Sequence, residues 1–334
     1  MRIVFRADAG HVEGSGHLMR CITLSEELRS RGHDVRFVGS VDVPWVANHM
    51  KDRGLDLVAS AAGELDQNLI LSAEPDWVVV DSYRIASDSI SDLAQRVPVL
   101  AIIDGTDREI AASLYLDQNM GAERNYKKDA PVLAGPRFAL IRSEILVERQ
   151  IPRPPLRTPP RVVCFMGGTD PTGAIVDVVA RAMQVRQDVE LVVIAPQKSH
   201  DEIRAMAPPR LDLRDPSPDL PLLLGTADVV VSAAGTSAWD VCTLAIPAVL
   251  IGVVDNQSGS LAEVRGEGLA LGIDLYMGES IARLTEVLDE LLSDEILRTD
   301  LSARCSAVFD GEGTVRVAEA MEQFLLRGQG RVDR

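Results

Sequence analysis

One stretch near the start of the chain constrains its fold more than any other. Residues 2–6 form an apolar run that is typical of a buried strand, and the loop His11–His17 with its two glycines follows it. Residues 18–28 then repeat apolar side chains at intervals of three and four, which predicts a helix with one buried face. Gly32 stands where a helix commonly ends in the left-handed conformation.

A strand, a glycine loop and a helix in this order present backbone N–H groups and a positive helix end to an anion. Here His17 stands at the first turn of the predicted helix, directly after Gly14, Ser15 and Gly16. Its imidazole can gain or lose a proton near neutral pH. We therefore expect an acid or base at the mouth of a phosphate–sugar site. His11, in the same loop, stays an open candidate.

The rest of the chain alternates apolar strands with helical stretches, which is the pattern of a parallel, doubly wound α/β sheet. The predicted strands lie at residues 34–38, 75–81, 99–104, 161–166, 190–195, 227–232 and 247–253. Helices are expected at 86–96 and 172–184, from 238 onward, and over the tail 279–327. In such sheets ligands bind at the carboxyl ends of the strands. His17, Tyr83 and Asp104 all follow strand ends, so they are candidates for one rim.

A proline-rich segment divides the chain. Residues 151–160 hold five prolines, too many for a helix or a central strand. Because the strand–helix pattern restarts after it, we expect a domain at 1–145, a linker at 146–160 and a second domain at 161–334. Both are expected to be Rossmann-like and to face a cleft, with the last helix packing back on the first domain.

Charge and cysteine content narrow the classes of function. The chain has 334 residues and a formal net charge of -16, which argues against binding nucleic acid or an anionic membrane surface. No apolar run of about 18 residues is present, so no spanning helix is expected, and the chain starts directly with a strand rather than a leader. The four cysteines lie far apart in apolar segments, which predicts buried thiols, no metal site and a cytoplasmic protein.

Three polar turns in the second half are candidate ligand sites. Gly167 and Gly168 allow close approach of the backbone, and Thr169 and Asp170 after them could bind a ligand or cap a helix. Ala233, Ala234, Gly235, Thr236 and Ser237 join a strand to a helix and are the stronger anion site. Asp240 in that helix could bind ribose hydroxyls or favour the positive helix end. Asp255-Asn256-Gln257 follows the next strand and reads as a polar turn at the rim.

Taken in order, these motifs resemble one known family. The resemblance rests on Arg6-Ala7-Asp8, Gly14-Ser15-Gly16-His17, Met19-Arg20-Cys21, Asp81-Ser82-Tyr83, Phe138-Ala139-Leu140-Ile141-Arg142, Met166-Gly167-Gly168-Thr169-Asp170, the Ser232–Asp240 turn and Asp255-Asn256-Gln257. The family is the UDP-2,4-diacetamido-2,4,6-trideoxy-β-L-altropyranose hydrolases of pseudaminic acid synthesis, grouped with the SpsG-like spore-coat polysaccharide proteins. The match extends from residue 2 to about residue 275.

The resemblance implies a glycosyltransferase-B fold and hydrolysis of the anomeric C–O bond of a UDP-sugar, with inversion. His17 then corresponds to the general base, Tyr83 to the active-site tyrosine and Asn256 to an asparagine near the sugar. The residues implied to contact substrate or nucleotide are Asp8, Gly14, Ser15, Gly16, Arg20, Gly167, Gly168, Thr169, Asp170, Ala233, Ala234, Gly235, Thr236, Ser237, Asp240 and Gln257. The scheme needs no cofactor or metal, because helix ends and N–H groups would hold the diphosphate.

Two departures from the family keep the substrate open. The turn Ala233–Ser237 has fewer glycines and serines than expected, and Asp240 stands where the family has a longer glutamate. The main alternative function is an inverting glycosyltransferase, which would use a similar base on a small acceptor hydroxyl. A nucleotide-sugar epimerase and a catalytically silent binding subunit are further alternatives, and the sequence is compatible with a monomer or a dimer.

Overall fold

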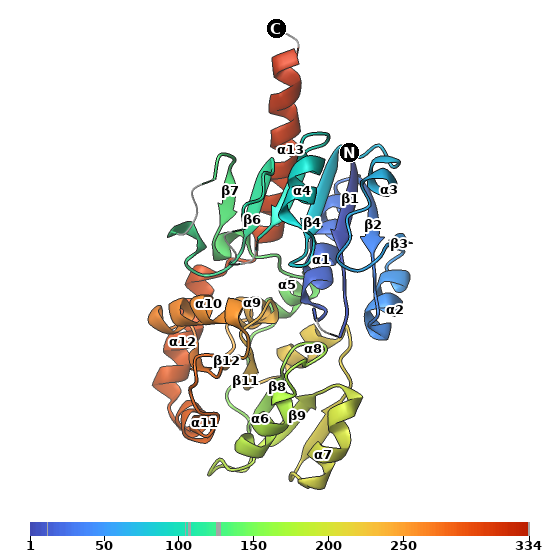
Figure 1. The fold of residues 1–334 in the computed structure, drawn as a ribbon. Helices are drawn as coiled ribbons and strands as arrows, with labels where there is room; N and C mark the ends of the chain where they lie inside the picture. Colours follow the sequence, from blue (N-terminus) through green and yellow to red (C-terminus); the bar gives the residue numbers. More distant parts are fainter. Residues whose placement is uncertain (12, 104, 106–107, 125–127, 333–334) are drawn as a thin grey trace. The chain divides into compact units, whose positions relative to one another are not determined.

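The structure is a computed structural model that describes residues 1–11, 13–103, 105, 108–124 and 128–332, with side chains described as far as Arg327. Asp104, one of the residues expected at the rim, lies outside this set. The chain divides into two compact units (Figure 1). The first consists of residues 1–13, 17–141 and 311–334, and the second of residues 14–16 and 142–310.

The first unit is built on a parallel sheet of seven strands among the described residues, in the order β3-β2-β1-β4-β5-β6-β7. The strands are β1 (Arg2–Ala7), β2 (Asp34–Gly39), β3 (Leu57–Ala59), β4 (Trp77–Asp81), β5 (Val99–Ile102), β6 (Leu114–Asp117) and β7 (Val132–Ala134). The helices are α1 (Gly16–Ser30), α2 (Pro44–Asp52), α3 (Gln67–Leu71), α4 (Ser87–Ala94), the short 3-10 turns η1 (Ala122–Arg124) and η2 (Pro136–Phe138), and α13 (Gly313–Val332).

The second unit repeats this plan with six parallel strands in the described part, ordered β10-β9-β8-β11-β12-β13. They are β8 (Arg161–Phe165), β9 (Glu190–Ile194), β10 (Leu211–Arg214), β11 (Val229–Ala233), β12 (Ala248–Gly252) and β13 (Leu271–Asp274). The helices are α5 (Ser143–Arg149), α6 (Ala174–Ala182), η3 (Gln197–Ser199), α7 (His200–Ala205), α8 (Leu220–Gly225), α9 (Ser237–Thr243), α10 (Asp255–Gly266), α11 (Arg283–Ser293) and α12 (Glu295–Val308).

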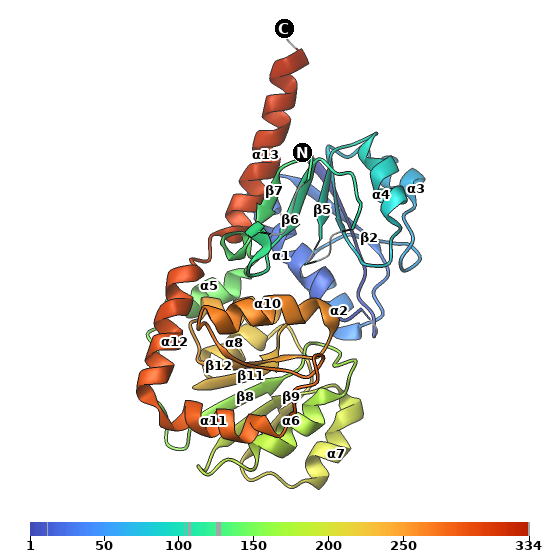
Figure 2. The same ribbon diagram turned by 60° about the vertical axis from the view of Figure 1, so that its left-hand side comes forward.

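Apolar strands explain why both sheets are covered on two faces. In the first unit, Phe5 and its same-face neighbours pack with α1 and α13, whereas Val4 on the opposite face packs with α3 and α4. Alternate residues of a strand point to opposite faces, so a continuous apolar run must be buried on both sides. In the second unit α6 and α11 lie on one side of the sheet and α10 on the other (Figure 2). The predicted α/β fold class with two parallel sheets is therefore confirmed.

The last helix belongs to the first unit although its sequence follows the second. Val317 and Met321 of α13 are fully buried in the first unit's core. The rings of Trp77 and Phe324 lie 5.0 Å apart, and Arg31 forms an ion pair of 3.0 Å with Glu322. These contacts tie residues after 310 to a sheet that is complete by residue 134.

Two local predictions differ from the structure. The tail 279–327 is divided into three helices, because the Asp294 side chain accepts the N–H of Leu297 and starts α12 as a new helix. Asp255-Asn256-Gln257 is the first turn of α10 rather than a loop. None of the helices in the described part of the chain is long and apolar enough to cross a membrane.

Candidate active site and nucleotide site

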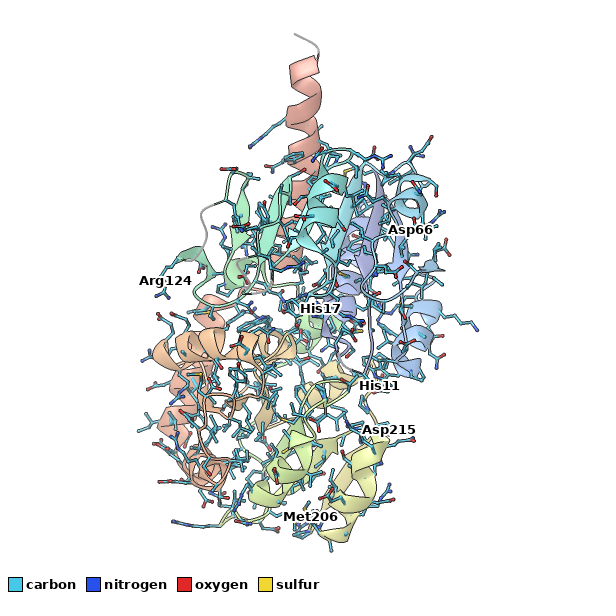
Figure 3. The ribbon with its side chains drawn as sticks, viewed as in Figure 1. His11, His17, Asp66, Arg124, Met206 and Asp215 are labelled. Atoms are coloured by element: carbon cyan, nitrogen blue, oxygen red, sulfur yellow. The ribbon has the colours of Figure 1, made fainter. Side chains whose placement is uncertain are left out.

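Sheet topology brings two of the predicted motifs of the first unit together. Strands β1 and β4 are neighbours and pair with Ala7 opposite Asp81. The loop after β1 leads to His17 at the start of α1, labelled in Figure 3, and Ser82 and Tyr83 follow β4 directly. Because both strands run in the same direction, these side chains meet at one edge of the sheet.

His17 and Arg20 share one buried carboxylate, that of Asp81. The Nδ1 atom of His17 lies 2.6 Å from Asp81 Oδ1. Arg20 forms a bidentate salt bridge with Asp81, donating from Nε to Oδ2 at 2.5 Å and from Nη2 to Oδ1 at 2.6 Å. Asp81 is 1% exposed, so this pair of arginine and carboxylate is shielded from water.

The cluster determines which histidine nitrogen can act as a base. Burial by itself raises the pKa of Asp81, but the charges and hydrogen bonds of Arg20 and His17 outweigh burial and hold this pKa well below its usual value. An ionised carboxylate can only accept, so we assign the proton of their 2.6 Å contact to His17 Nδ1; Arg20 Nη2 lies 3.1 Å from the same nitrogen but donates to Asp81 Oδ1 at the shorter distance of 2.6 Å. The lone pair then belongs to Nε2, which is the arrangement of a general base held by a carboxylate.

Tyr83 completes this cluster from the loop after β4. Its ring meets the His17 ring edge to face, with centroids 4.6 Å apart and planes at 86°. Tyr83 is 39% exposed, whereas His17 is 9% exposed. The partly exposed phenol and the edge of the nearly buried imidazole can contact a substrate, while the contact with Asp81 fixes the orientation of the imidazole.

The structure places Asp8 outside this cluster. One Asp8 oxygen accepts from Arg6 at 2.6 Å, and the backbone N–H groups of Ser40 and Gly63 fill the carboxylate's other contacts at 2.9 Å each. Arg6 is fully buried, so Asp8 serves to neutralise it and to join β1 to two loops. His11 is exposed, and nothing in the described residues gives it a chemical role.

The predicted residues of the second unit lie along the carboxyl edge of its sheet. Strands β8, β11 and β12 are consecutive in that sheet, so the turns that follow them are neighbours. Gly167 has a φ of +82°, which requires glycine. Thr169 is 6% exposed, and its Oγ1 has no hydrogen-bond partner among the described residues. A buried hydroxyl without a partner is uncommon in proteins and makes Thr169 a candidate for ligand binding.

Asp170 has a structural function. Its carboxylate accepts the backbone N–H groups of Ala174 at 3.1 Å and Ile175 at 3.2 Å. It is 1% exposed and therefore caps the start of α6. Of the two uses that the sequence left open for Asp170, the contacts favour the cap.

Only part of the turn before α9 is accessible to solvent. Ala233 and Ala234 are buried, and the Ala234 N–H donates to Ile251 O at 2.9 Å. Gly235, Thr236 and Ser237 are half-buried, and Thr236 begins α9 without capping it through its side chain. A Cβ atom on Gly235 would lie 3.4 Å from Gln257 Nε2, so the second and third turns touch.

Two further residues of this edge differ in their surroundings. Asn256 is exposed on the first turn of α10. Asp240 is buried, and its Oδ2 accepts from Arg142 Nε at 3.1 Å and Nη2 at 2.5 Å. Burial raises the pKa of Asp240, and Arg142 opposes only part of that rise. No local pattern predicts this ion pair, because Arg142 precedes Asp240 by 98 residues.

Asp81 is the other candidate site residue that sequence reasoning missed. It is an ionisable group at the end of an apolar strand that pairs with β1. That position is a usable signal, because a carboxylate there must find a cation. Within the described residues, no group of three or more His, Cys, Asp or Glu side chains could hold a metal ion, and all four cysteines are buried and unpaired by disulfides.

The architecture defines the class. Two parallel α/β units of this kind form the glycosyltransferase-B fold, and the solved structures that match have it. The spinosyn rhamnosyltransferase SpnG complexed with thymidine diphosphate matches with a TM-score of 0.66 and 16% identity, over 97% of this chain and all of SpnG. Staphylococcus aureus MnaA in complex with UDP matches with a TM-score of 0.68 and 14% identity, over 97% of this chain and 96% of MnaA.

The sequence comparison finds a relative that matches along nearly the whole chain. The spore coat polysaccharide biosynthesis protein SpsG of Bacillus subtilis (strain 168) is 22% identical over 356 aligned positions, which cover 97% of this chain and 98% of SpsG. No family model matches the chain. The resemblance to SpsG-like proteins that the motifs predicted is thereby confirmed: the chain is similar to SpsG over nearly its whole length, and it has a glycosyltransferase-B fold.

Proposed function

We propose that this protein hydrolyses a nucleotide-activated sugar, with His17 as the base that activates water. The observation that carries the proposal is the His17–Asp81 contact of 2.6 Å beneath Tyr83. It leaves Nε2 of a nearly buried imidazole as the proton acceptor at the carboxyl edge of a parallel sheet. A protein that only binds a nucleotide-sugar needs no such base.

The reaction is a single displacement. A water oxygen bonds to the anomeric carbon while His17 Nε2 takes a water proton, and the bond from that carbon to the diphosphate oxygen breaks. The bonding electrons leave with the nucleoside diphosphate, and the sugar is released with inverted configuration. Asp81 stabilises the imidazolium that forms, because its lowered pKa keeps it ionised.

The second unit is proposed to hold the nucleotide. Support comes from the half-buried turn Gly235–Ser237, from the buried Thr169 hydroxyl and from Gly167, beside which a Cβ atom would meet open space. UDP is bound in the MnaA structure, so UDP is the first nucleotide to test here. In this scheme Asn256 contacts the sugar, and no step requires a metal or another cofactor.

An inverting glycosyltransferase is the second candidate. It is favoured by the likeness to a rhamnosyltransferase of the same fold. In that reaction the His17 base would take its proton from an acceptor hydroxyl instead of water. Both candidates use the same residues and differ only in the nucleophile.

One experiment tests the proposal and separates the candidates. The purified protein is incubated with a panel of UDP- and TDP-sugars, without acceptor, and nucleoside diphosphate and free sugar are measured by mass spectrometry. Hydrolysis predicts rapid release of both from at least one member, with one atom of ¹⁸O entering the sugar from labelled water. Release that occurs only after an acceptor is added, without ¹⁸O in the sugar, would establish the transferase instead.

A further inference from the structure

The loop that carries Tyr83 is held by an arginine from a distant part of the chain. Arg108 donates from Nη1 to the carbonyl oxygen of Ser82 at 2.7 Å and from Nη2 to that of Ile85. These carbonyls flank Tyr83 on both sides. Within the loop, the Ser82 hydroxyl accepts the N–H groups of Arg84 at 3.1 Å and Ile85 at 3.3 Å.

The chemistry of this contact suits a clamp better than a binding group. A guanidinium presents its donors in a rigid planar fork, so it can hold two carbonyls at once, and an ammonium cannot reproduce that geometry. Burial lowers the pKa of Arg108. The Arg108 guanidinium is therefore partly shielded from water, and it donates hydrogen bonds to backbone carbonyl oxygens.

Arg108 is itself fixed from its other side. Its carbonyl oxygen accepts from Lys128 Nζ at 2.9 Å, and Lys128 lies 5.7 Å from the centre of the Tyr115 ring on β6. Ile85, at the end of the clamped loop, is 1% exposed and belongs to the apolar core that also contains Tyr115. Only Tyr83 and Arg84 project from a loop whose two ends are held.

We propose that Arg108 is a positioning residue that holds Tyr83 against His17. Its two side-chain hydrogen bonds go to the backbone on both sides of Tyr83, so it acts on the ring through that backbone. Without the clamp, the carbonyls of Ser82 and Ile85 would turn toward water and the phenol ring would leave its edge-to-face contact. Only the turnover test of this inference rests on the proposed function, because the structural test needs no substrate.

Nuclear magnetic resonance tests the clamp without any substrate. The Tyr83 ring current shifts the Hε1 signal of His17, which is assigned by its loss in His17→Ala. Tyr83→Ala removes that ring current, and Arg108→Ala should move the signal most of the way to its Tyr83→Ala position. Arg108→Lys, which keeps the charge and loses the fork, should move it part of the way. A His17 signal unchanged in both Arg108 variants would overturn the proposal, whatever reaction the protein performs.

Turnover provides the second test. Arg108→Ala should lower kcat about 10- to 100-fold, as expected for a displaced active-site group, and change KM less than about 3-fold. In a Tyr83→Ala background the same substitution should cost under about 3-fold, because the residue it positions is gone. Equal losses in both backgrounds would contradict the proposal. Arg96→Ala, a matched exposed arginine that contacts Gln67, should leave kcat unchanged.

Discussion

Asp81 offers the sharpest test of how the site works. Asp81→Asn preserves size and removes the charge that faces His17 and Arg20. The neutral amide no longer fixes the proton on His17 Nδ1, since it can present either an oxygen or an N–H group to that nitrogen. The base at Nε2 is then lost in part of the molecules, and the imidazolium that forms during the reaction has no counter-charge.

The structure gives the expected size of both effects. Loss of the carboxylate that orients a catalytic histidine lowers kcat by about 10²- to 10⁴-fold, which corresponds to about 3–5 kcal/mol. Arg20 is 2% exposed, so leaving it without its partner charge destabilises the first unit by about 3–5 kcal/mol. The variant should therefore lose activity and melt earlier.

A pH series isolates the contribution of Asp81 to stability. Its pKa in the folded protein lies below the unfolded value, which is about 3.9 for aspartate. Stability from this group is thus fully present above the unfolded pKa and is lost as pH falls through the folded pKa. The difference in unfolding free energy between wild type and Asp81→Asn should shrink as the pH falls below about 4, where Asp81 becomes protonated.

Asp228→Asn is the matched control. Asp228 is also buried and pairs with Arg157 at 3.1 Å, but it lies before β11, at the amino edge of the second sheet. It should lower the melting temperature and leave kcat within about 3-fold of wild type. Stopped assays of nucleoside diphosphate release, with thermal unfolding in parallel, measure both quantities. If Asp81→Asn also kept kcat within about 3-fold, the assignment of His17 as a carboxylate-held base would be refuted.

Three further substitutions test other parts of the site. His17→Ala should reduce turnover by about 10³-fold or more while UDP affinity, measured by calorimetry, changes less than about 3-fold; wild-type turnover would exclude His17 as the base. Thr169→Val should weaken UDP binding about 10-fold and leave the melting temperature nearly unchanged, because no internal hydrogen bond is lost; unchanged UDP affinity would remove Thr169 from the nucleotide site. Asp170→Ala should destabilise the second unit by about 1–2 kcal/mol through loss of the α6 cap, and a melting temperature equal to wild type would contradict that role.

The sequence alone predicted the architecture and singled out His17 as a candidate base. Apolar runs such as Trp77–Val80 must be covered on both faces, and their alternation with helices leads to a parallel sheet regardless of long-range detail. The position of His17 after a glycine loop could also be predicted from the sequence, because the strand, the loop and the helix are contiguous in the chain.

The partners of these residues were decided by tertiary structure. Asp81 lies 64 residues from His17 and Arg108 lies 26 from Ser82, so pairing follows from the order of strands in the sheet and not from spacing in the chain. A buried carboxylate is stable only with hydrogen-bond donors around it. For this reason Asp170 caps α6, Asp8 pairs with Arg6 and Asp240 pairs with Arg142. Local pattern specifies which element a residue occupies, whereas the charge that it must neutralise is known only when the chain is folded.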